Sequence, residues 1–114
     1  MMARLDAAEV QTFLLGQTLY AFDPDRYALA ATVTYARDGT CTAVFADGAR
    51  DKGRFGLEGD TYWTRYERFR RGEMHRFYLI SVGLDTALAY HADGRRAFLQ
   101  SQRAEVDDLF LGWG

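Results

Sequence analysis

Residues 60–99 read DTYWTRYERFRRGEMHRFYLISVGLDTALAYHADGRRAFL, a stretch in which short β-rich runs alternate with turn pairs that contain glycine. Similar pairs recur along the chain, at Asp38-Gly39, Asp47-Gly48, Glu58-Gly59, Arg71-Gly72, Gly83-Leu84 and Asp93-Gly94. Their glycines are 9, 11, 13, 11 and 11 residues apart. Glycine accepts the positive φ of tight turns, and the intervening runs are rich in Val, Thr, Tyr, Phe and Trp, so the pattern is typical of β-hairpins.

The turn spacing predicts an eight-stranded antiparallel up-and-down meander. We expect the strands at 17–22, 27–37, 40–46, 51–57, 60–69, 73–82, 85–92 and 95–101. If every hairpin has a two-residue loop, each turn fixes which side chains face each other and which face of the sheet they share. This register pairs Tyr35 with Thr42, Phe55 with Tyr62, Tyr66 with Phe77, Leu79 with Leu88, Leu88 with Leu99 and Ala89 with Phe98.

One face of the predicted sheet is apolar or hydroxyl-bearing, with no charge in its middle. It comprises Leu29, Ala31, Val33, Tyr35, Thr42, Val44, Phe55, Leu57, Tyr62, Thr64, Tyr66, Phe77, Leu79, Leu88, Tyr90, Ala97 and Leu99. One loop length is left open, because a three-residue loop at Asp47-Gly48 would instead turn Cys41, Ala43 and Phe45 inward.

A flat sheet would leave that apolar face in water. Closing the strands into a barrel buries the face and removes both sheet edges, so we expect an all-β fold with a closed barrel over residues 17–101. A sandwich of two sheets is the alternative. Short helices are expected at 6–15, where the sequence matches a capping box, and at 104–111, where apolar residues recur at helical spacing. Both attach to one end of the barrel, which leaves the other end open.

Composition indicates a single domain spanning residues 1–114. The chain has 114 residues, of which 48% are hydrophobic, and this excludes two packed domains and general disorder. A net charge of −2 is too weak a footprint for nucleic acid or an anionic membrane. Cys41 is the single cysteine, so an intrachain disulfide is excluded. No apolar run is long enough for a signal peptide or a membrane span, so we expect a cytoplasmic protein.

Two stretches of the sequence resemble a known family. Tyr35-Ala-Arg-Asp38-Gly39-Thr40 and Gly53-Arg-Phe-Gly-Leu-Glu-Gly59-Asp60, followed by further Asp-Gly turns, are similar to the small lipocalin-like (calycin-type) barrels of bacteria. The resemblance covers residues 17–100, with Gly16-Gln17-Thr18 in the place of the Gly-x-Trp that lipocalins often have near the first strand. It implies a lipocalin-like barrel that binds a small, largely apolar molecule.

The predicted inner face carries the candidate ligand-binding residues, which are Tyr35, Tyr62, Tyr66, Arg68, His75, Phe77 and Tyr90. Buried hydroxyls need hydrogen-bond partners, and a cavity with a ligand or ordered water would supply them. Arg68 and His75 would face each other across the Arg71-Gly72 hairpin and contact one anionic group, because a guanidinium fits a carboxylate or phosphate. The alternatives are a filled barrel with its tyrosine hydroxyls at the rim, and an exposed Arg68 that pairs with Asp51.

The predicted outer face carries a candidate interface. Its apolar strip consists of Trp63, Tyr78, Ile80 and Phe98. Exposed strips of this kind mark protein–protein interfaces, so a homodimer is one interpretation. Cover by the predicted C-terminal helix is the other.

The sequence contains little that indicates catalysis, a metal or a cofactor. His91 is expected outside, opposite Arg96 and away from His75, and Cys41 is expected to point outward. We therefore expect non-enzymatic binding of one small hydrophobic or amphipathic anion inside the barrel, with no cofactor, metal, nucleic acid or membrane partner. The alternative is a protein–protein interaction module with a filled barrel. A barrel enzyme that uses His75 and a tyrosine is a third, less supported interpretation.

Overall fold

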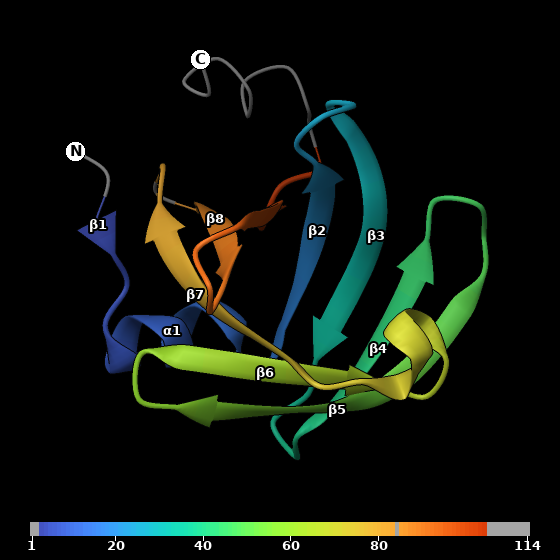
Figure 1. Ribbon diagram of the computed structural model, residues 1–114, viewed down its shortest axis with the longest axis horizontal. Helices are drawn as coiled ribbons and strands as arrows, with labels where there is room; N and C mark the ends of the chain where they lie inside the picture. Colours follow the sequence, from blue (N-terminus) through green and yellow to red (C-terminus); the bar gives the residue numbers. More distant parts are fainter. Residues whose placement is uncertain (1–2, 84, 105–114) are drawn as a thin grey trace.

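Eight antiparallel strands close into a barrel, as the turn spacing predicts (Figure 1). The computed structural model describes residues 3–83 and 85–104. In chain order the barrel strands are β2 (Gln17–Asp23), β3 (Ala28–Tyr35), β4 (Thr40–Phe45), β5 (Arg50–Glu58), β6 (Thr61–Tyr66), β7 (His75–Ser81), β8 (Thr86–His91) and β9 (Arg96–Ser101). Each strand pairs with the next, and β9 pairs with β2 to complete the ring. The closed ring excludes the sandwich.

A short helix, α1 (Ala7–Leu14), confirms the helix expected at 6–15. The carboxylate of Asp6 accepts a hydrogen bond from the backbone N–H of Glu9, and the carboxylate of Glu9 accepts one from the N–H of Asp6. This reciprocal pair is the capping box that the sequence predicts, and it satisfies two N–H groups that the first turn leaves unpaired.

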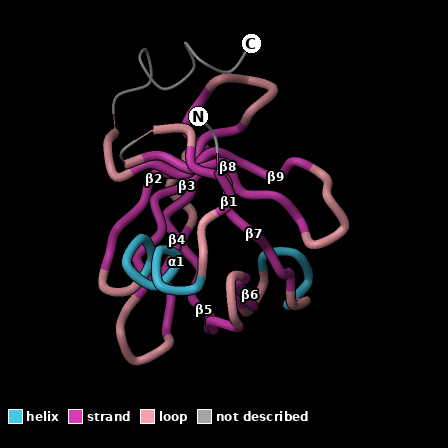
Figure 2. Tube along the Cα trace, turned by 90° about the vertical axis from the view of Figure 1, so that its left-hand side faces the viewer, coloured by secondary structure: helices cyan, strands magenta, loops and turns pink. Residues whose placement is uncertain are grey.

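Helix α1 closes one end of the barrel. It contacts β2, β5 and β6 (Figure 2), and its buried side chains Val10, Phe13 and Leu14 join the main hydrophobic core. Ahead of it, β1 (Ala3–Arg4) pairs with the end of β7. The C-terminal helix expected at 104–111 lies outside the described residues, apart from its first position. No helix in the described part of the chain has the length and apolar character to cross a membrane.

The three Asp-Gly loops contain three residues each, not two. In each loop the Asp side chain accepts a hydrogen bond from the N–H of the residue after the glycine. A type I turn followed by one left-handed residue produces such a loop, and the glycines have the φ it requires. These φ values are +92° for Gly39, +89° for Gly48 and +94° for Gly94. The expected two-residue loops are therefore wrong at Asp38-Gly39 and Asp93-Gly94, whereas at Asp47-Gly48 the three-residue alternative that the sequence left open is the correct one.

The two loops around β4 reverse the orientation of that strand. Tyr35 pairs with Cys41 and not with Thr42, so Cys41 and Ala43 are buried inside the barrel. Thr42 and Val44, which were expected inside, are exposed. The loop at Asp47-Gly48 is also one residue longer than a two-residue loop, so it reverses the faces a second time and β5 has its expected orientation.

The pairing of β5 with β6 also differs from the expected register, but without a change of face. The loop between these strands is Gly59-Asp60, so Phe55 faces Thr64 and not Tyr62. Because the register moves by two residues, every side chain keeps its side of the sheet. Tyr62, Thr64 and Tyr66 are accordingly buried.

The connection between β6 and β7 is longer than a tight turn. It contains the short helical segment η1 (Phe69–Gly72), and strand pairing ends at Thr64 and His75. Phe77 therefore faces Tyr62 and not Tyr66. The expected opposition of Arg68 and His75 is wrong, because Arg68 lies beyond the paired part of β6.

The β7–β8 loop reverses the orientation of β8. The N–H of Val82 donates to the carbonyl of Thr86 across a three-residue loop, so Leu79 faces Ala89 and not Leu88. Tyr90, expected inside, is consequently on the outer face. His91, expected outside, lies on the inner face, where its ring centre is 5.2 Å from that of Phe77.

The last strand follows β8, so its faces are exchanged as well. A β-bulge between Ala89 and Tyr90 offsets the extra residue of the Asp93-Gly94 loop, so the expected pairings of Leu88 with Leu99 and of Ala89 with Phe98 are confirmed. Phe98 nevertheless points inward, with its ring centre 5.3 Å from that of Phe77. Leu88 and Leu99 are still buried, but they form a separate small cluster with Phe22. The fold thus has one core inside the barrel and a second on part of its outer face.

Candidate ligand-binding site

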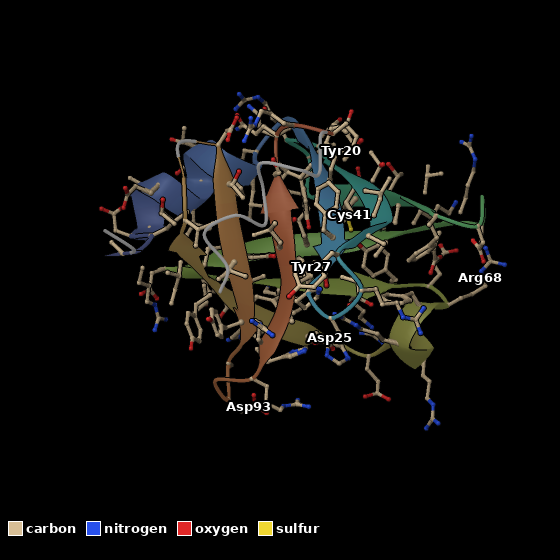
Figure 3. The ribbon with its side chains drawn as sticks, turned by 90° about the horizontal axis from the view of Figure 1, so that it is seen from above. Tyr20, Asp25, Tyr27, Cys41, Arg68 and Asp93 are labelled. Atoms are coloured by element: carbon tan, nitrogen blue, oxygen red, sulfur yellow. The ribbon has the colours of Figure 1, made fainter. Side chains whose placement is uncertain are left out.

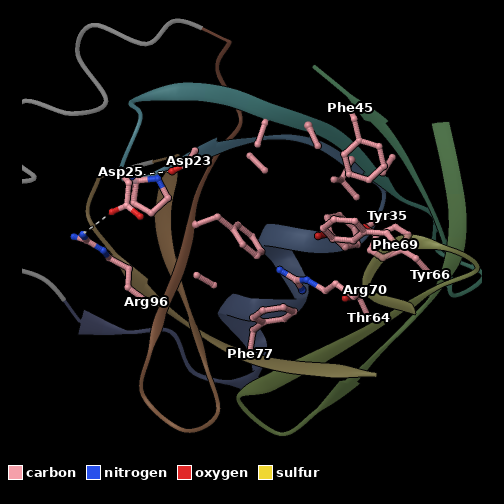
Figure 4. Close-up of a pocket in the computed structure, with 18 residues that line it drawn as sticks. Asp23, Asp25, Tyr35, Phe45, Thr64, Tyr66, Phe69, Arg70, Phe77 and Arg96 are labelled. Carbon is pink, nitrogen blue, oxygen red and sulfur yellow. Dashed lines mark hydrogen bonds and ion pairs between the residues drawn. The ribbon is translucent and has the colours of Figure 1, made fainter. Parts of the chain in front are cut away.

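A cavity of about 370 Å³ occupies part of the barrel interior (Figure 4). Asp23 at the end of β2 and the loop residues Pro24 and Asp25 line one side of it, and the Asp25 side chain is 87% exposed. The cavity therefore reaches solvent at this rim, whereas α1 closes the opposite end. One open and one closed end agree with the sequence-based expectation.

Small side chains make room for the cavity. Eight-stranded barrels are just wide enough for side chains to fill them, so empty space requires small residues on some strands. Strands β2, β3, β4 and β9 supply Ala21, Ala30, Ala31, Val33, Ala43 and Ala97. Six aromatic residues form much of the remaining wall, namely Tyr35, Phe45, Tyr66, Phe69, Phe77 and Phe98, and Thr64, Arg70 and Arg96 also line it. At about 30 Å³ for each water-sized group, the cavity could hold roughly twelve such groups.

Arg70 brings a guanidinium into this apolar space. Figure 4 shows its side chain extending from η1 towards the middle of the pocket. The guanidinium carbon lies 5.0 Å from the ring centre of Phe69 and 5.3 Å from that of Phe77, within cation–π range. Within residues 3–83 and 85–104, Arg70 has no ion pair and no hydrogen bond through its side chain.

An unusual backbone conformation directs Arg70 inward. Arg70 and Arg71 have φ of +55° and +58°, and Gly72 follows at +70°, so three successive residues are left-handed. Each non-glycine residue in this conformation costs about 1–2 kcal/mol. Such strain persists only where surrounding contacts hold the segment in place.

Asp51 and Phe69 supply those contacts. The Asp51 carboxylate is 4% exposed and accepts hydrogen bonds from the backbone N–H groups of Lys52, Arg68 and Phe69, at 2.9, 3.1 and 2.7 Å. Burial by itself raises the pKa of Asp51, but these three donors outweigh it and hold the pKa below its ordinary value. The Phe69 ring packs 5.0 Å from that of Phe45. The turn that carries Arg70 is therefore anchored at the two residues that precede Arg70.

The cavity leaves the positive charge of Arg70 partly desolvated. Burial lowers the pKa of Arg70, against an opposing effect of the nearby tyrosine hydroxyls. A guanidinium still remains protonated at neutral pH, because its ordinary pKa is so high. A partly desolvated cation without a bonded anion favours the entry of a negatively charged group.

A buried hydroxyl network lies next to the cavity. The Tyr35 hydroxyl donates to the side-chain oxygen of Gln100 at 3.2 Å, and the Gln100 amide donates to the Tyr62 hydroxyl at 2.8 Å. Gln100 is fully buried. Burial raises the pKa of Tyr35, Tyr62 and Tyr66, so all three phenols stay protonated. Burial also raises the pKa of Cys41 to about 11, which keeps its thiol neutral.

Two half-buried histidines lie near Arg70 on the inner face. The ring centres of His75 and His91 are 5.8 Å apart. Burial lowers the pKa of both, and the positive charges of Arg70 and Arg95 lower it further. Glu73 opposes the shift at His75, and Asp93 opposes it at His91. Near neutral pH both rings are therefore uncharged.

These two histidines are expected to make the protein less stable as the pH falls from about 7.5 to about 5.5. Their pKa is lowered in the folded chain, so the unfolded chain binds protons first, and stability is lost as the pH drops towards the folded-state pKa. The urea midpoint should fall over this range, and the double variant His75→Gln/His91→Gln should show a smaller fall. An equal fall in both proteins would contradict this origin.

The structure brings together part of the predicted ligand-binding set. Tyr35, Tyr66 and Phe77 line the cavity. Tyr62 does not line it and is connected to it through Gln100. His75 is on the inner face, beyond the residues that line the cavity.

Two members of the set lie away from the cavity. Arg68 is at the periphery (Figure 3), where its side chain is 80% exposed, donates to the carbonyl of Arg50 and lies 4.0 Å from Asp51. This is the alternative in which Arg68 pairs with Asp51. Tyr90 is on the outer face and stacks on Tyr78 at 5.4 Å. Whether the remaining residues bind a ligand stays a prediction.

Arg70 and Gln100 are not among the site residues predicted from the sequence. The only signal for Arg70 is the basic run in residues 68–71, and the alternation of strand residues does not extend into a non-strand turn. Gln100 is two residues after Phe98 on β9, so their side chains lie on the same face of the strand. With the correct length of the β7–β8 loop, the sequence would have placed both side chains inside the barrel. A polar Gln100 on this inward face would then have been predicted as a hydrogen-bond partner for the buried hydroxyls.

The predicted outer strip is not assembled as one surface. Phe98 is inside the barrel, as described above. The Tyr78 ring is covered by the Arg4 guanidinium at 4.2 Å, and Ile80 is opposite Arg4 in the pairing of β1 with β7. Trp63 faces Arg76 in the pairing of β6 with β7 and is therefore not opposite Ile80 of the same strip. Its use as an interface stays a prediction.

Comparison with known proteins gives no family and no relative from which a function could be carried over. No family model matches the chain, and no curated protein or solved structure matches it. The closed eight-stranded barrel is compatible with a lipocalin-like fold. Among residues 3–83 and 85–104, no three His, Cys, Asp or Glu side chains are grouped so that they could hold a metal ion.

Proposed function

We propose that this barrel binds one small amphipathic or apolar molecule in its interior. The observation that supports this most directly is the cavity of about 370 Å³, which lies between small residues and an aromatic wall and opens at one rim. A volume in this range is typical of sites for small ligands, and such sites are mostly apolar with a few polar groups. Here the polar groups are the guanidinium of Arg70 and the hydroxyls of Tyr35 and Tyr66.

Filling the cavity is expected to abolish binding while leaving the fold intact. Ala31 lies on β3, is 7% exposed and lines the cavity, so Ala31→Phe adds a ring to the space that a ligand would occupy. The probe is naphthylmethanol, a neutral molecule with roughly twelve non-hydrogen atoms to match the estimated capacity. Isothermal titration calorimetry should show micromolar binding to the wild-type protein, weakened at least about tenfold in the variant.

Val44→Phe is the matched control. Val44 is on the neighbouring strand β4, faces outward and is 37% exposed, so the added ring does not enter the barrel. It should bind the probe as the wild type does. Equal binding by all three proteins would place the probe outside the barrel and contradict the proposal. Native mass spectrometry of protein purified from its host would show directly whether a molecule of this size copurifies.

A protein–protein interaction module remains the alternative, with less support from the structure. The filled interior that it assumed does not fit the cavity. Of the strip residues, Phe98 lies inside the barrel, the Tyr78 ring is covered by Arg4, and Ile80 lies beside β1. A homodimer therefore stays a prediction.

A further inference from the structure

We propose that Arg70 receives the carboxylate of the ligand, so that the barrel selects a monocarboxylic acid with an apolar body of roughly ten carbon atoms. This inference rests on the proposed function and adds the chemical class of the ligand.

Among the arginines near the open end, Arg70 combines partial burial in the cavity wall with the lack of an acidic partner in the described part of the chain. Arg68 lies 4.0 Å from Asp51, Arg95 is 2.7 Å from Asp93, and Arg96 is 3.9 Å from Asp25. In the described part of the chain, the guanidinium of Arg70 has no ion pair and lies near the rings of Phe69 and Phe77. Charges that are partly removed from water are normally paired, so the guanidinium of Arg70 points to a partner outside the described residues.

The turn is built to present this one guanidinium. Arg70 and Arg71 share the same left-handed conformation, yet Arg71 is exposed and Arg70 lines the cavity. Asp51 and Phe69 hold the preceding residues in place against the strain. Strained backbone held by specific contacts is often found at ligand-binding positions.

The surrounding charges favour one negative charge over two. A single guanidinium can hold a carboxylate with two parallel hydrogen bonds. His75 and His91 are nearby but uncharged near neutral pH, and the other guanidinium that lines the cavity, that of Arg96, lies 3.9 Å from Asp25. Asp23 and Asp25 at the rim would repel a second negative charge on the ligand. These conditions fit a monocarboxylate better than a phosphate dianion.

The test compares an acid with its neutral counterpart. Naphthalene carboxylate and naphthylmethanol have the same apolar body, and decanoate with decanol provides a second, flexible pair. Calorimetry should show that wild-type protein binds each acid at least about tenfold more tightly than its alcohol, as expected for a charge-assisted hydrogen bond. In Arg70→Met this preference should fall to about one, with the alcohol still bound within about threefold of its wild-type affinity.

Arg71→Met is the matched control, because it removes the same charge from the neighbouring residue with the same backbone conformation. It should keep the preference for the acid. Arg70→Gln is the second variant, and the thermal midpoint of each protein is measured on the same samples to confirm that it is folded.

Each outcome separates this inference from the proposed function. If the wild type binds acid and alcohol equally, or if the preference survives Arg70→Met and Arg70→Gln, the role of Arg70 is wrong and the barrel still binds a ligand. If Arg71→Met loses the preference as fully as Arg70→Met, the effect is one of net charge and the inference is overturned. If the wild type binds none of the four probes, both proposals fail.

Discussion

Replacing Gln100 with leucine is expected to lower the free energy of unfolding by about 2–4 kcal/mol. Gln100 is fully buried and connects the hydroxyls of Tyr35 and Tyr62, which are both almost completely buried. Leucine fits the space but offers neither donor nor acceptor, so each hydroxyl loses a partner. A buried polar group without its partner costs about 1–3 kcal/mol. Urea unfolding followed by circular dichroism measures the change.

The loss of stability in Gln100→Leu should come from the Tyr35 and Tyr62 hydroxyls that are left without a partner, and not from a change in side-chain volume. Removing both sides of a buried hydrogen bond can be nearly neutral, whereas removing one side is costly. The triple variant Gln100→Leu/Tyr35→Phe/Tyr62→Phe should therefore be more stable than Gln100→Leu alone. If the triple variant were less stable by the sum of its parts, the network would be contributing net stability and this explanation would be wrong.

Most of the architecture could be predicted from the sequence because it depends on turns at regular spacing. The eight strands, the meander order, the closed barrel and the N-terminal helix follow from glycine pairs, from the need to bury one face and from the Asp6–Glu9 pattern. These features are predicted correctly even when the length of a loop is wrong by one residue. Strand count and closure do not change when a loop is one residue longer.

The orientation of individual strands could not be predicted, because it changes with every residue in a loop. Asp38-Gly39 fits both a two-residue loop and a three-residue loop with a left-handed glycine. Choosing the shorter one at that loop turned β4 over in the prediction, and a second error restored β5. A similar error at the β7–β8 loop exchanged His91 with Tyr90 and Phe98 with Leu99. Local sequence does not distinguish the two loops, and packing of the whole barrel decides between them.

The candidate site was only partly predictable for the same reason. Tyr35, Tyr66 and Phe77 lie on strands whose predicted orientation is correct, and they line the cavity. Arg70 depends on two consecutive left-handed arginines, a conformation that propensity disfavours. It is stabilised by the tertiary contacts of Asp51 and Phe69. A residue whose position depends on overriding its local preference cannot be found from strand alternation.

Gly53→Ala is expected to destabilise the protein by at least about 3 kcal/mol. Gly53 lies in the middle of β5, opposite Tyr66 on β6. A Cβ at residue 53 would overlap the carbonyl oxygen of Arg65 and lie 2.7 Å from the Cα of Tyr66. Both neighbours are backbone atoms, so relief would require the two strands to separate. Glycine inside a strand often marks such a close approach at a barrel corner.

Two other glycines separate this effect from a general intolerance of alanine. A Cβ at Gly83 would lie 3.8 Å from the Thr86 side chain, an ordinary contact, so Gly83→Ala should change stability by less than about 0.5 kcal/mol. At Gly56 the obstacle is the indole of Trp63, a side chain that can turn away, so Gly56→Ala should have an intermediate effect. Urea unfolding should show the largest loss of stability for Gly53→Ala, a smaller one for Gly56→Ala and the smallest for Gly83→Ala.

Because Tyr66 is both opposite Gly53 and part of the cavity wall, separation of the strands at Gly53 should also weaken ligand binding in any protein that remains folded. If Gly53→Ala were as stable as Gly83→Ala, the close approach of β5 and β6 would not be a requirement of the fold.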